Sequence, residues 1–205
     1  MTPPVVRVRT DQLDELAAMF ARAFVDEPDL RAMFPDPRRR AAIVPPWGAV
    51  SLHLSYLDDK IMETTPAGNC VIIWIRPGQS TSWQSYVRAA PYLWQMLRRA
   101  SPGDVRRFLT FFTRLETRRH DLLPEPHWFL EALAVDPQRQ RFGLGAVLVR
   151  HGLARADADH VPAYVETDTE ANAVFYSKLG FELVEYVEDY PPMNIPTWRM
   201  VHQPL

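Results

Sequence analysis

The sequence predicts an α/β fold in which helices flank one mixed β-sheet. In the C-terminal half, strand-like apolar runs at 128–135 and 162–167 are each followed by a segment with helical spacing. The N-terminal half supplies a short alternating run, a helical segment and two neighbouring strand-like runs. Strands that alternate with helices in one half and form a hairpin in the other indicate a sheet with both parallel and antiparallel neighbours.

The first elements follow from hydrophobic periodicity. Residues 5–9 (VVRVR) alternate and predict a strand, and Thr10 can then cap a helix. The apolar residues of this helix recur at helical spacing: Leu13, Leu16, Ala17, Phe20 and Phe24. The helix should end before DEPD (26–29), because the residue before a proline avoids helical angles. A second helical region is expected at about 37–56, with its start interrupted by Pro45 and Pro46.

The middle of the chain predicts a hairpin and then two helices. The runs at 60–65 and 69–76 are joined by PAG and read as paired strands. Residues 83–119 predict two helices that meet at SPGD, with Ser101 as the cap of the second. The remaining expected elements are strands at 128–135, 162–167, 181–187 and 195–202 and helices at 143–158 and 171–180.

Composition restricts the class of protein. A length of 205 residues favours a single domain, 1–205, and 47% hydrophobic with 23% charged residues is ordinary for a soluble globular protein. A net charge of −2 gives no reason to expect a nucleic-acid partner. Because Cys70 is the single cysteine, we expect no disulfide within one chain, no cysteine metal cluster and no metal. No signal peptide and no apolar run of about 18 residues is present, so we expect a cytoplasmic protein without a membrane partner.

One stretch suggests a phosphate-binding site. VDPQRQRFGLG (135–145) lies where a strand ends and a helix begins, and the free N–H groups of a helix start can hold a phosphate. A P-loop would need Lys and Ser or Thr after Gly145, and a dinucleotide fingerprint would need glycine at Leu148. The remaining pattern is Q-x-x-G-x-G, from Gln140 to Gly145. Alone it is a weak signal, equally compatible with a tight turn.

The surrounding stretches make the pattern specific. HWFLEALAVDP (127–137), PAYVET (162–167) and NAVFYSKLGF (172–181) follow one another at close spacing around the glycine turn. Together they resemble the GNAT superfamily of acetyl-CoA-dependent N-acetyltransferases, strongly over 128–200 and more loosely before. Within it the sequence looks most like puromycin N-acetyltransferase-like proteins, an antibiotic-resistance type of activity, with AFVDEP (23–28) and TWRM (197–200) as further support.

The resemblance implies a coenzyme A site. The strand before the glycine turn would splay from its neighbour and hold pantetheine through its main chain, and the N–H groups after it would hold the pyrophosphate. The wider superfamily has an asparagine where this chain has Thr169, and Asn172 would take its place. The implied cofactor-binding residues are Leu133, Ala134, Val135, Gln140, Arg141, Phe142, Gly143, Leu144, Gly145, Ala146, Thr167, Asn172, Phe175 and Tyr176.

The resemblance also implies direct attack of an amine on the thioester. Tyr176 matches the tyrosine that protonates the leaving thiolate, and the main-chain N–H of Leu133 or Val135 would stabilise the oxyanion. We expect Glu131 to act as general base, because it alternates onto the face of Leu133 and Val135 within an apolar run. Each residue also has a structural interpretation: Tyr176 as a core tyrosine and Glu131 as an ion-pair partner.

The expected acceptor is the primary amine of a small molecule. Residues 77–127 would form a helical insertion that walls the acceptor site, and its aromatic residues suit a bulky amine. Candidate acceptor-binding residues are Glu27, Phe24 and His127; the acid at Glu27 suits a cationic acceptor and speaks against puromycin. Glu27 could equally be a second general base or a solvated loop acid, and His127 structural. A non-catalytic acyl-CoA-binding protein and a peptide acetyltransferase stay as alternatives, and the chain could be a monomer or a homodimer.

Overall fold

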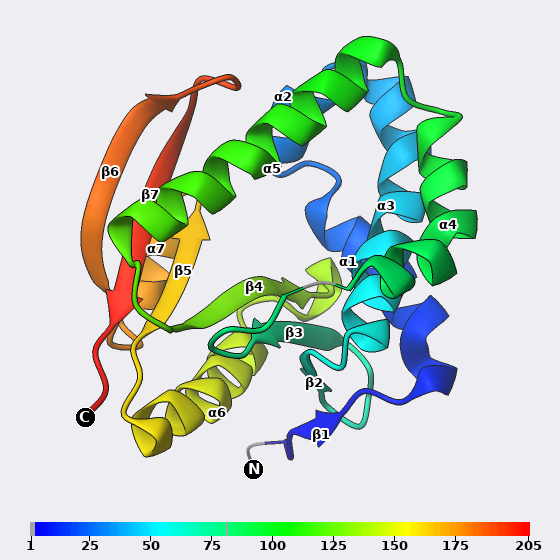
Figure 1. Ribbon diagram of the computed structural model, residues 1–205. Coiled ribbons are helices and arrows are strands. Elements are labelled where there is room, and N and C mark those ends of the chain that lie inside the picture. The colour runs from blue at the N-terminus through cyan, green and yellow to red at the C-terminus, as the bar shows by residue number, and fades with distance from the viewer. Residues whose placement is uncertain (1–2, 81) are drawn as a thin grey trace.

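The centre of the fold is a seven-stranded mixed sheet in the order β1-β2-β3-β4-β5-β7-β6 (Figure 1). This computed structural model describes residues 3–80 and 82–205. Residues 1, 2 and 81, which the expected single domain includes, lie outside the described residues. The strands are β1 Val6–Arg7, β2 Ile61–Thr64, β3 Cys70–Ile75, β4 Trp128–Val135, β5 Ala163–Thr167, β6 Glu182–Tyr190 and β7 Ile195–His202. The predicted mixed α/β fold is therefore confirmed.

Seven α-helices surround this sheet among the described residues. They are α1 Leu13–Phe24, α2 Pro28–Met33, α3 Pro37–Leu57, α4 Trp83–Leu97, α5 Pro102–Leu122, α6 Leu144–Asp159 and α7 Glu170–Ser177. Short 3-10 turns precede α1 and α6, at Thr10–Gln12 (η1) and Pro137–Arg139 (η2). None of the described helices is long and apolar enough to cross a membrane.

Two features of the N-terminal half differ from the expectation. The DEPD segment is not only a break, because Pro28 begins the short helix α2. The expected interruption at Pro45 and Pro46 is absent, and α3 continues through both prolines. Val44 and Trp47 are buried in the core that α3 shares with α1, and this burial offsets the hydrogen bonds that the prolines cannot donate.

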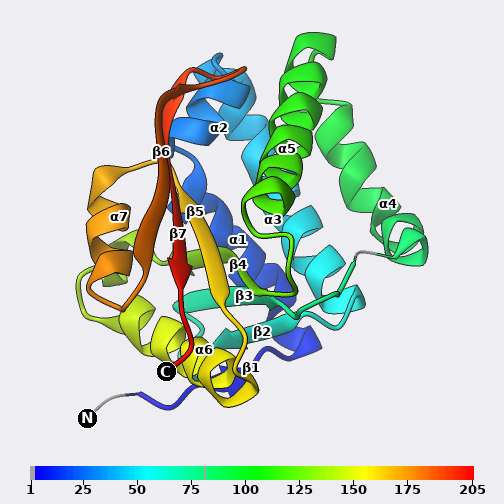
Figure 2. The ribbon, with the colours of Figure 1, turned by 60° about the vertical axis from the view of Figure 1, so that its left-hand side comes forward.

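The sheet separates two hydrophobic cores. On one face, α1 packs on β3 and β4 and is covered in turn by α3. On the other face, α6 packs on β3 and β4, and α7 packs on β7 (Figure 2).

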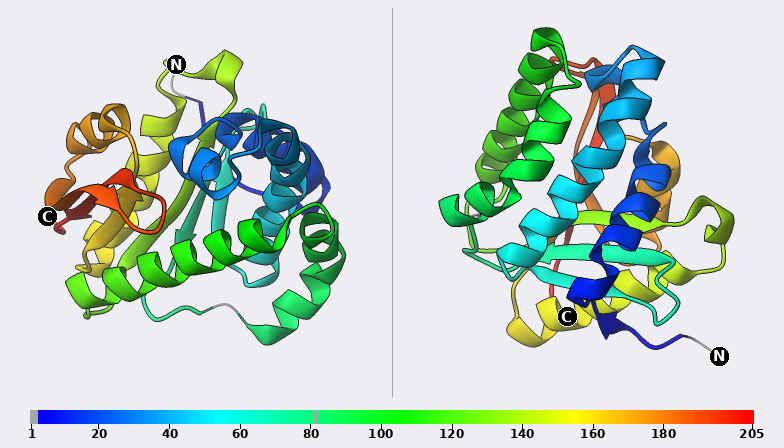
Figure 3. Two further views of the ribbon diagram at one scale, coloured as in Figure 1. Left: turned by 90° about the horizontal axis from the view of Figure 1, so that it is seen from above. Right: turned by 90° about the vertical axis from the view of Figure 1, so that its right-hand side faces the viewer.

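The expected pair of helices before β4 is confirmed. At the start of α5 the Ser101 hydroxyl accepts a hydrogen bond from the Asp104 N–H at 3.2 Å, and the Asp104 carboxylate accepts one from the Ser101 N–H at 2.8 Å. This is the capping box that SPGD predicts. α4 packs beside α3, and α5 then crosses above the sheet from α2 towards the start of β4 (Figures 1 and 3).

The central strands β4 and β5 are parallel but separate early. Their pairing covers Trp128–Leu130 against Ala163–Val165 and stops there. Figure 1 shows β4 and β5 running in different directions beyond this point. The β4 main chain from Glu131 to Val135 keeps β3 as a neighbour on one side and has no strand partner on the β5 side. This opening is the splay that the sequence resemblance implied.

Candidate active site

The glycine turn presents a helix start without a side-chain cap. Gly143 precedes α6 with φ of 80°, and Arg141 also has a positive φ of 69°. No side chain caps the helix, and its first turn, residues 144–147, is only half-buried. The Gln140 side-chain amide donates to the Val135 carbonyl oxygen at 3.3 Å and ties the turn to the end of β4. Free N–H groups at the start of a 16-residue helix are suited to a pyrophosphate.

Three of the expected pantetheine-side elements meet at Gly145. A Cβ atom at this position would lie 3.4 Å from the Leu133 side chain, 3.5 Å from Phe175 and 3.7 Å from Val135. The structure therefore brings β4, the first turn of α6 and α7 together on the α6 face of the sheet. An unpaired strand edge, an uncapped helix start and a narrow glycine approach fit the extended phosphopantetheine arm of coenzyme A.

The other expected cofactor residues border this region. Ala134 is buried and its side chain lies in the core of the α1 face, so only its main chain can contribute. Phe142 is 73% exposed at the turn, and Arg141 is exposed beside it. Thr167 ends β5, and the exposed Asn172 donates its main-chain N–H to the Thr169 hydroxyl, which caps α7. Thr169, which stands where the wider superfamily has asparagine, therefore serves as the cap of α7.

Tyr176 lies buried behind the opened strands. It is 7% exposed and packs edge-on against Phe175 and Phe181. Its hydroxyl has no hydrogen-bond partner among the described residues. Burial raises the pKa of Tyr176 above its usual value, and the nearby carboxylates of Asp168 and Glu27 raise it further. The phenol therefore stays protonated and can donate a proton.

Carboxylates from distant parts of the chain gather next to this tyrosine. The Asp168 carboxylate, at the carboxyl end of β5, accepts a hydrogen bond from the Asp29 N–H at 2.9 Å. Burial and the neighbouring Asp168 raise the pKa of Asp29 to about 8. Burial also raises the pKa of Asp168. The pKa of Glu27 is raised by burial and, to a lesser extent, by the negative charge of Asp168. Glu27 was expected at the acceptor site; Asp29 and Asp168 were not.

A sequence signal existed for only one of the two additional acids. Asp168 directly follows the strand 163–167, and the carboxyl ends of parallel strands are where ligands bind in such sheets. Asp29 is 139 residues away in the sequence, and nothing near it indicates this contact.

Glu131 does not lie as its spacing predicts. A β-bulge falls here, because Ile73 pairs with Ala132 while Trp74 pairs with Leu130. The expectation that Glu131 shares a face with Leu133 and Val135 is therefore wrong, since those two side chains pack with the core on the α6 face. Instead the Glu131 carboxylate reaches the α3 side.

Glu131 is an ion-pair partner on that side. The Lys60 amino group, which is 4% exposed, donates to both carboxylate oxygens at 2.7 and 2.9 Å, and the Ser55 hydroxyl donates at 3.3 Å. A carboxylate neutralised by a buried lysine is poorly suited to remove a proton from a cationic amine.

Phe24 and His127 have defined surroundings. Phe24, half-buried at the end of α1, stacks on Phe20 at 4.5 Å between ring centroids. His127 is buried before β4, where Nδ1 lies 2.8 Å from the Glu125 carbonyl oxygen and Nε2 lies 2.8 Å from an Arg119 nitrogen. Both ring nitrogens are thus engaged with the protein, and burial lowers the pKa of His127.

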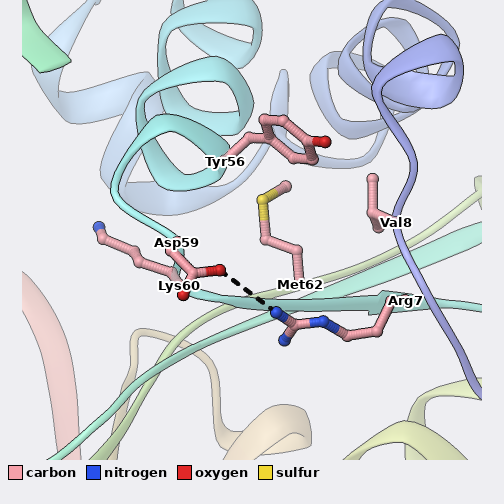
Figure 4. Close-up of a pocket in the computed structure, with 6 residues that line it drawn as sticks. All are labelled: Arg7, Val8, Tyr56, Asp59, Lys60 and Met62. Atoms are coloured by element: carbon pink, nitrogen blue, oxygen red, sulfur yellow. Dashed lines mark ion pairs between the residues drawn. The ribbon is translucent and has the colours of Figure 1, made fainter.

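A separate hollow lies at the other edge of the sheet. It has a volume of about 340 Å³ and is lined by Arg7, Val8, Tyr56, Asp59, Lys60 and Met62. Figure 4 shows the Arg7–Asp59 ion pair across it, 3.5 Å long, with the Lys60 amino group directed away. None of the expected site residues lines this hollow. Within 3–80 and 82–205, no three His, Cys, Asp or Glu side chains are grouped closely enough to hold a metal ion.

In this sheet two parallel central strands splay apart, and a helix without a side-chain cap begins beside them after a glycine. This arrangement defines a class of enzymes that bind a phosphate-bearing cosubstrate along the opened strand. Residues 71–181 match the model of the acetyltransferase (GNAT) family. The match spans more than half of the chain, so the protein belongs to this family. It is an acetyl-CoA-dependent N-acetyltransferase.

Solved structures share the fold over the whole chain. A protein of Corynebacterium glutamicum described as histone acetyltransferase HPA2 and related acetyltransferase is 21% identical, with a TM-score of 0.73 and coverage of 100% of this chain and 98% of that one. An agmatine N-acetyltransferase is 16% identical (TM-score 0.59; coverage 99% and 100%). A polyamine N-acetyltransferase of Drosophila melanogaster is 17% identical (TM-score 0.57; coverage 98% and 99%).

Proposed function

We propose that this enzyme transfers the acetyl group of acetyl-CoA to a primary amine of a small molecule by direct attack. The observation that carries the proposal is the surroundings of Tyr176. Its side chain is buried on the α6 face, its hydroxyl has no hydrogen-bond partner among the described residues, and the carboxylates of Asp168 and Glu27 lie near enough to act on it. Acetyl-CoA supplies an activated acetyl group as a thioester. The protein has to bind it, orient it and move protons.

The residues that would hold acetyl-CoA lie on the α6 side of the splay. Main-chain groups of Leu133 and Val135 would bind pantetheine, and the main-chain N–H groups of residues 141–146 the pyrophosphate. A main-chain N–H of the opened strand would stabilise negative charge on the acetyl oxygen. The Tyr176 hydroxyl would give its proton to the leaving sulfur.

The acceptor would enter from the opposite face, below α5. Glu131 lies in a central strand, yet its side chain is 31% exposed, so the helices do not cover this part of β4 completely. α5 crosses above the same face, which favours a small molecule over a peptide (Figure 1). The neighbouring acids suit a cationic amine. That chemistry departs from a puromycin-type acceptor, although the motif resemblance to such proteins extends over 127–181.

The first test replaces Tyr176 by Phe. Turnover with a panel of amines, including agmatine, putrescine and phenethylamine, should fall by roughly 10²-fold, because the leaving thiolate loses its proton donor. The midpoint of thermal unfolding should still rise by several degrees with acetyl-CoA. Ligand at 100 times its dissociation constant stabilises the folded state by about 2.7 kcal/mol, and each kcal/mol shifts the midpoint by about 2–4 °C.

The matched control is Tyr186→Phe, at a tyrosine that is 47% exposed on β6. It should leave both readouts unchanged. Full activity of Tyr176→Phe would remove the phenol from the mechanism. A wild-type protein that acetyl-CoA does not stabilise would contradict the proposed binding site.

A further inference from the structure

Asp29 and Asp168, here called the Asp29–Asp168 pair, join two distant segments through a hydrogen bond from the Asp29 main chain to the Asp168 carboxylate. The pair connects the start of α2 with the end of β5 through the 2.9 Å hydrogen bond from the Asp29 N–H. Glu27, the residue before Pro28, lies close enough for its charge to act on Asp29, and Asp168 acts on both. None of these three acids forms an ion pair with a basic side chain in the described parts of the chain.

The basic groups around the pair do not neutralise it. Arg31, on α2 itself, acts on Glu27 but is 60% exposed and lies 3.5 Å from Asp26. On the other elements packed against α2, namely α3, α5 and β7, four arginines have partners outside the pair. Arg39 pairs with Asp36 and Asp104, Arg40 donates to the Val25 and Phe34 carbonyl oxygens, Arg107 pairs with Asp104 and donates to the Met33 carbonyl oxygen, and Arg199 pairs with Glu185.

Two hydroxyl groups of buried residues have no hydrogen-bond partner in the described parts of the chain. One is the phenol of Tyr176, whose pKa responds to Asp168 and Glu27. The other is the hydroxyl of Thr197, which is 4% exposed. β5 and β7 pair as Glu166 with Arg199 and Thr167 with Trp198, so the same register continued by one residue sets Thr197 opposite Asp168. An ammonium group needs several oxygen acceptors at one place, and these atoms supply them.

We propose that the Asp29–Asp168 pair binds the acceptor as an alkylammonium ion and accepts the proton that this amine must lose before it attacks. The inference rests on the proposed function and names the substrate class of the same site. One N–H bond of the ammonium breaks, its proton moves to a carboxylate oxygen, and the nitrogen keeps the electron pair that forms the bond to the acetyl carbon. After attack, the Tyr176 proton goes to sulfur as the C–S bond breaks, and the second proton that leaves the nitrogen restores the Tyr176 hydroxyl.

The substrate class is therefore a strongly basic alkylamine. Before binding, burial and the charge of Asp168 favour the protonated form of Asp29, whose pKa they raise to about 8. An arriving cation favours the ionised pair, so binding near pH 7 releases a proton. An alcohol of the same shape brings no charge and should neither bind well nor release a proton.

The test is calorimetric titration with phenethylamine, putrescine and agmatine, with 2-phenylethanol as the neutral isostere of the first. Titrations are run with and without coenzyme A, in phosphate and in Tris at pH 7, because the difference in buffer ionisation heat gives the number of protons released. Wild type should bind at least one amine with proton release. Asp168→Asn and Asp29→Asn should each weaken that binding by about 10-fold or more and suppress the release.

Asp26→Asn is the matched control, since Asp26 lies in the same segment but is 66% exposed. It should bind and release protons like wild type. Coenzyme A binding by each variant, read from thermal unfolding, shows that the fold is intact. Equal amine affinity and equal proton release in both pair variants would overturn the inference, as would a wild type that binds no amine or binds the alcohol equally well.

The outcome separates the inference from the proposed function. Proton-linked amine binding without acetyl transfer would preserve the ammonium site and refute the proposed reaction. Acetyl transfer at the wild-type rate in both pair variants would preserve the reaction and refute the site.

Discussion

Gly152 allows the indole of Trp74 to lie directly against the backbone of α6. A Cβ atom at this position would overlap the ring of Trp74, a β3 residue that is 1% exposed in the core of the α6 face. In an open helix, replacing glycine by alanine stabilises by about 0.5–1 kcal/mol. Here the overlap opposes that gain, because neither the helix backbone nor a buried indole can move freely.

Gly152→Ala should therefore destabilise the protein by about 1–3 kcal/mol, the usual cost of overpacking a core. Urea unfolding would give this as a lower midpoint with an unchanged slope. Gly103→Ala is the control, because its Cβ would meet only side-chain atoms at contact distances, the nearest being an Arg107 nitrogen at 3.4 Å and the Ser101 hydroxyl oxygen at 3.7 Å. Equal midpoints for the two variants would show that Trp74 can move aside.

The sequence predicted one side of the candidate active site and missed the other. The coenzyme A side follows from a contiguous motif, and Gly145, Leu133 and Phe175 do meet. The acceptor side that we propose depends on contacts between residues far apart, such as Asp29 with Asp168. Periodicity describes one element at a time and cannot reveal which loop will lie against which strand end.

Among the elements, α5 depends most visibly on its first turn. Ser101 and Asp104 satisfy each other's main-chain N–H groups, and Asp104 also pairs with Arg107 and Arg39. Side chains on the outer surface of this helix are exposed, including Leu109 at 59%. The helix buries few side chains fully, so its capped end contributes a large share of its stability.

Ser101→Ala should cost about 1 kcal/mol and increase hydrogen exchange of the first α5 amides before it affects the sheet. Mass spectrometry of exchange would resolve the two regions. Thr113→Ala, on the exposed surface of the same helix, should have no such effect. Unchanged exchange at residues 103–105 in Ser101→Ala would show that the Arg107 and Arg39 contacts alone hold this end.

The sequence predicted a helix or strand well where the local residue pattern determines it. It predicted an element poorly where packing against other parts of the chain determines it. The strands at 128–135 and 195–202 were located correctly, because each is a short segment rich in apolar residues. The continuation of α3 through Pro45 and Pro46 was missed, since burial against α1 outweighs the local preference. The bulge at Glu131 was missed for the same reason, and one extra residue reversed the face of its side chain.

For the whole molecule, the Asp29–Asp168 pair predicts a pH dependence of stability. The pKa of Asp29 is about 8 in the folded protein and about 3.9 in an unfolded chain. Between these values the folded state binds more protons at this site than the unfolded state. The free energy of unfolding contributed by Asp29 therefore falls as the pH rises from about 4 to 8.

Asp29→Asn removes this contribution. The variant should gain stability relative to wild type as the pH rises, by on the order of 1 kcal/mol between pH 5 and pH 8. Urea unfolding at both pH values measures the difference, with Asp26→Asn as the reference. A constant difference between Asp29→Asn and wild type across this range would mean that Asp29 titrates like an exposed acid.

The route of the chain from β3 to β4 has a consequence for how such proteins diversify. These two strands are antiparallel neighbours, yet residues 76–127 intervene between them. The entropy of closing a connection grows only logarithmically, by about 0.6 kcal/mol for each doubling of its length. The helices of this connection, which lie above the face that we propose for the acceptor, can therefore be lengthened, shortened or exchanged during evolution at little cost to the sheet. Related enzymes can therefore come to use different amines while their acetyl-CoA site stays the same.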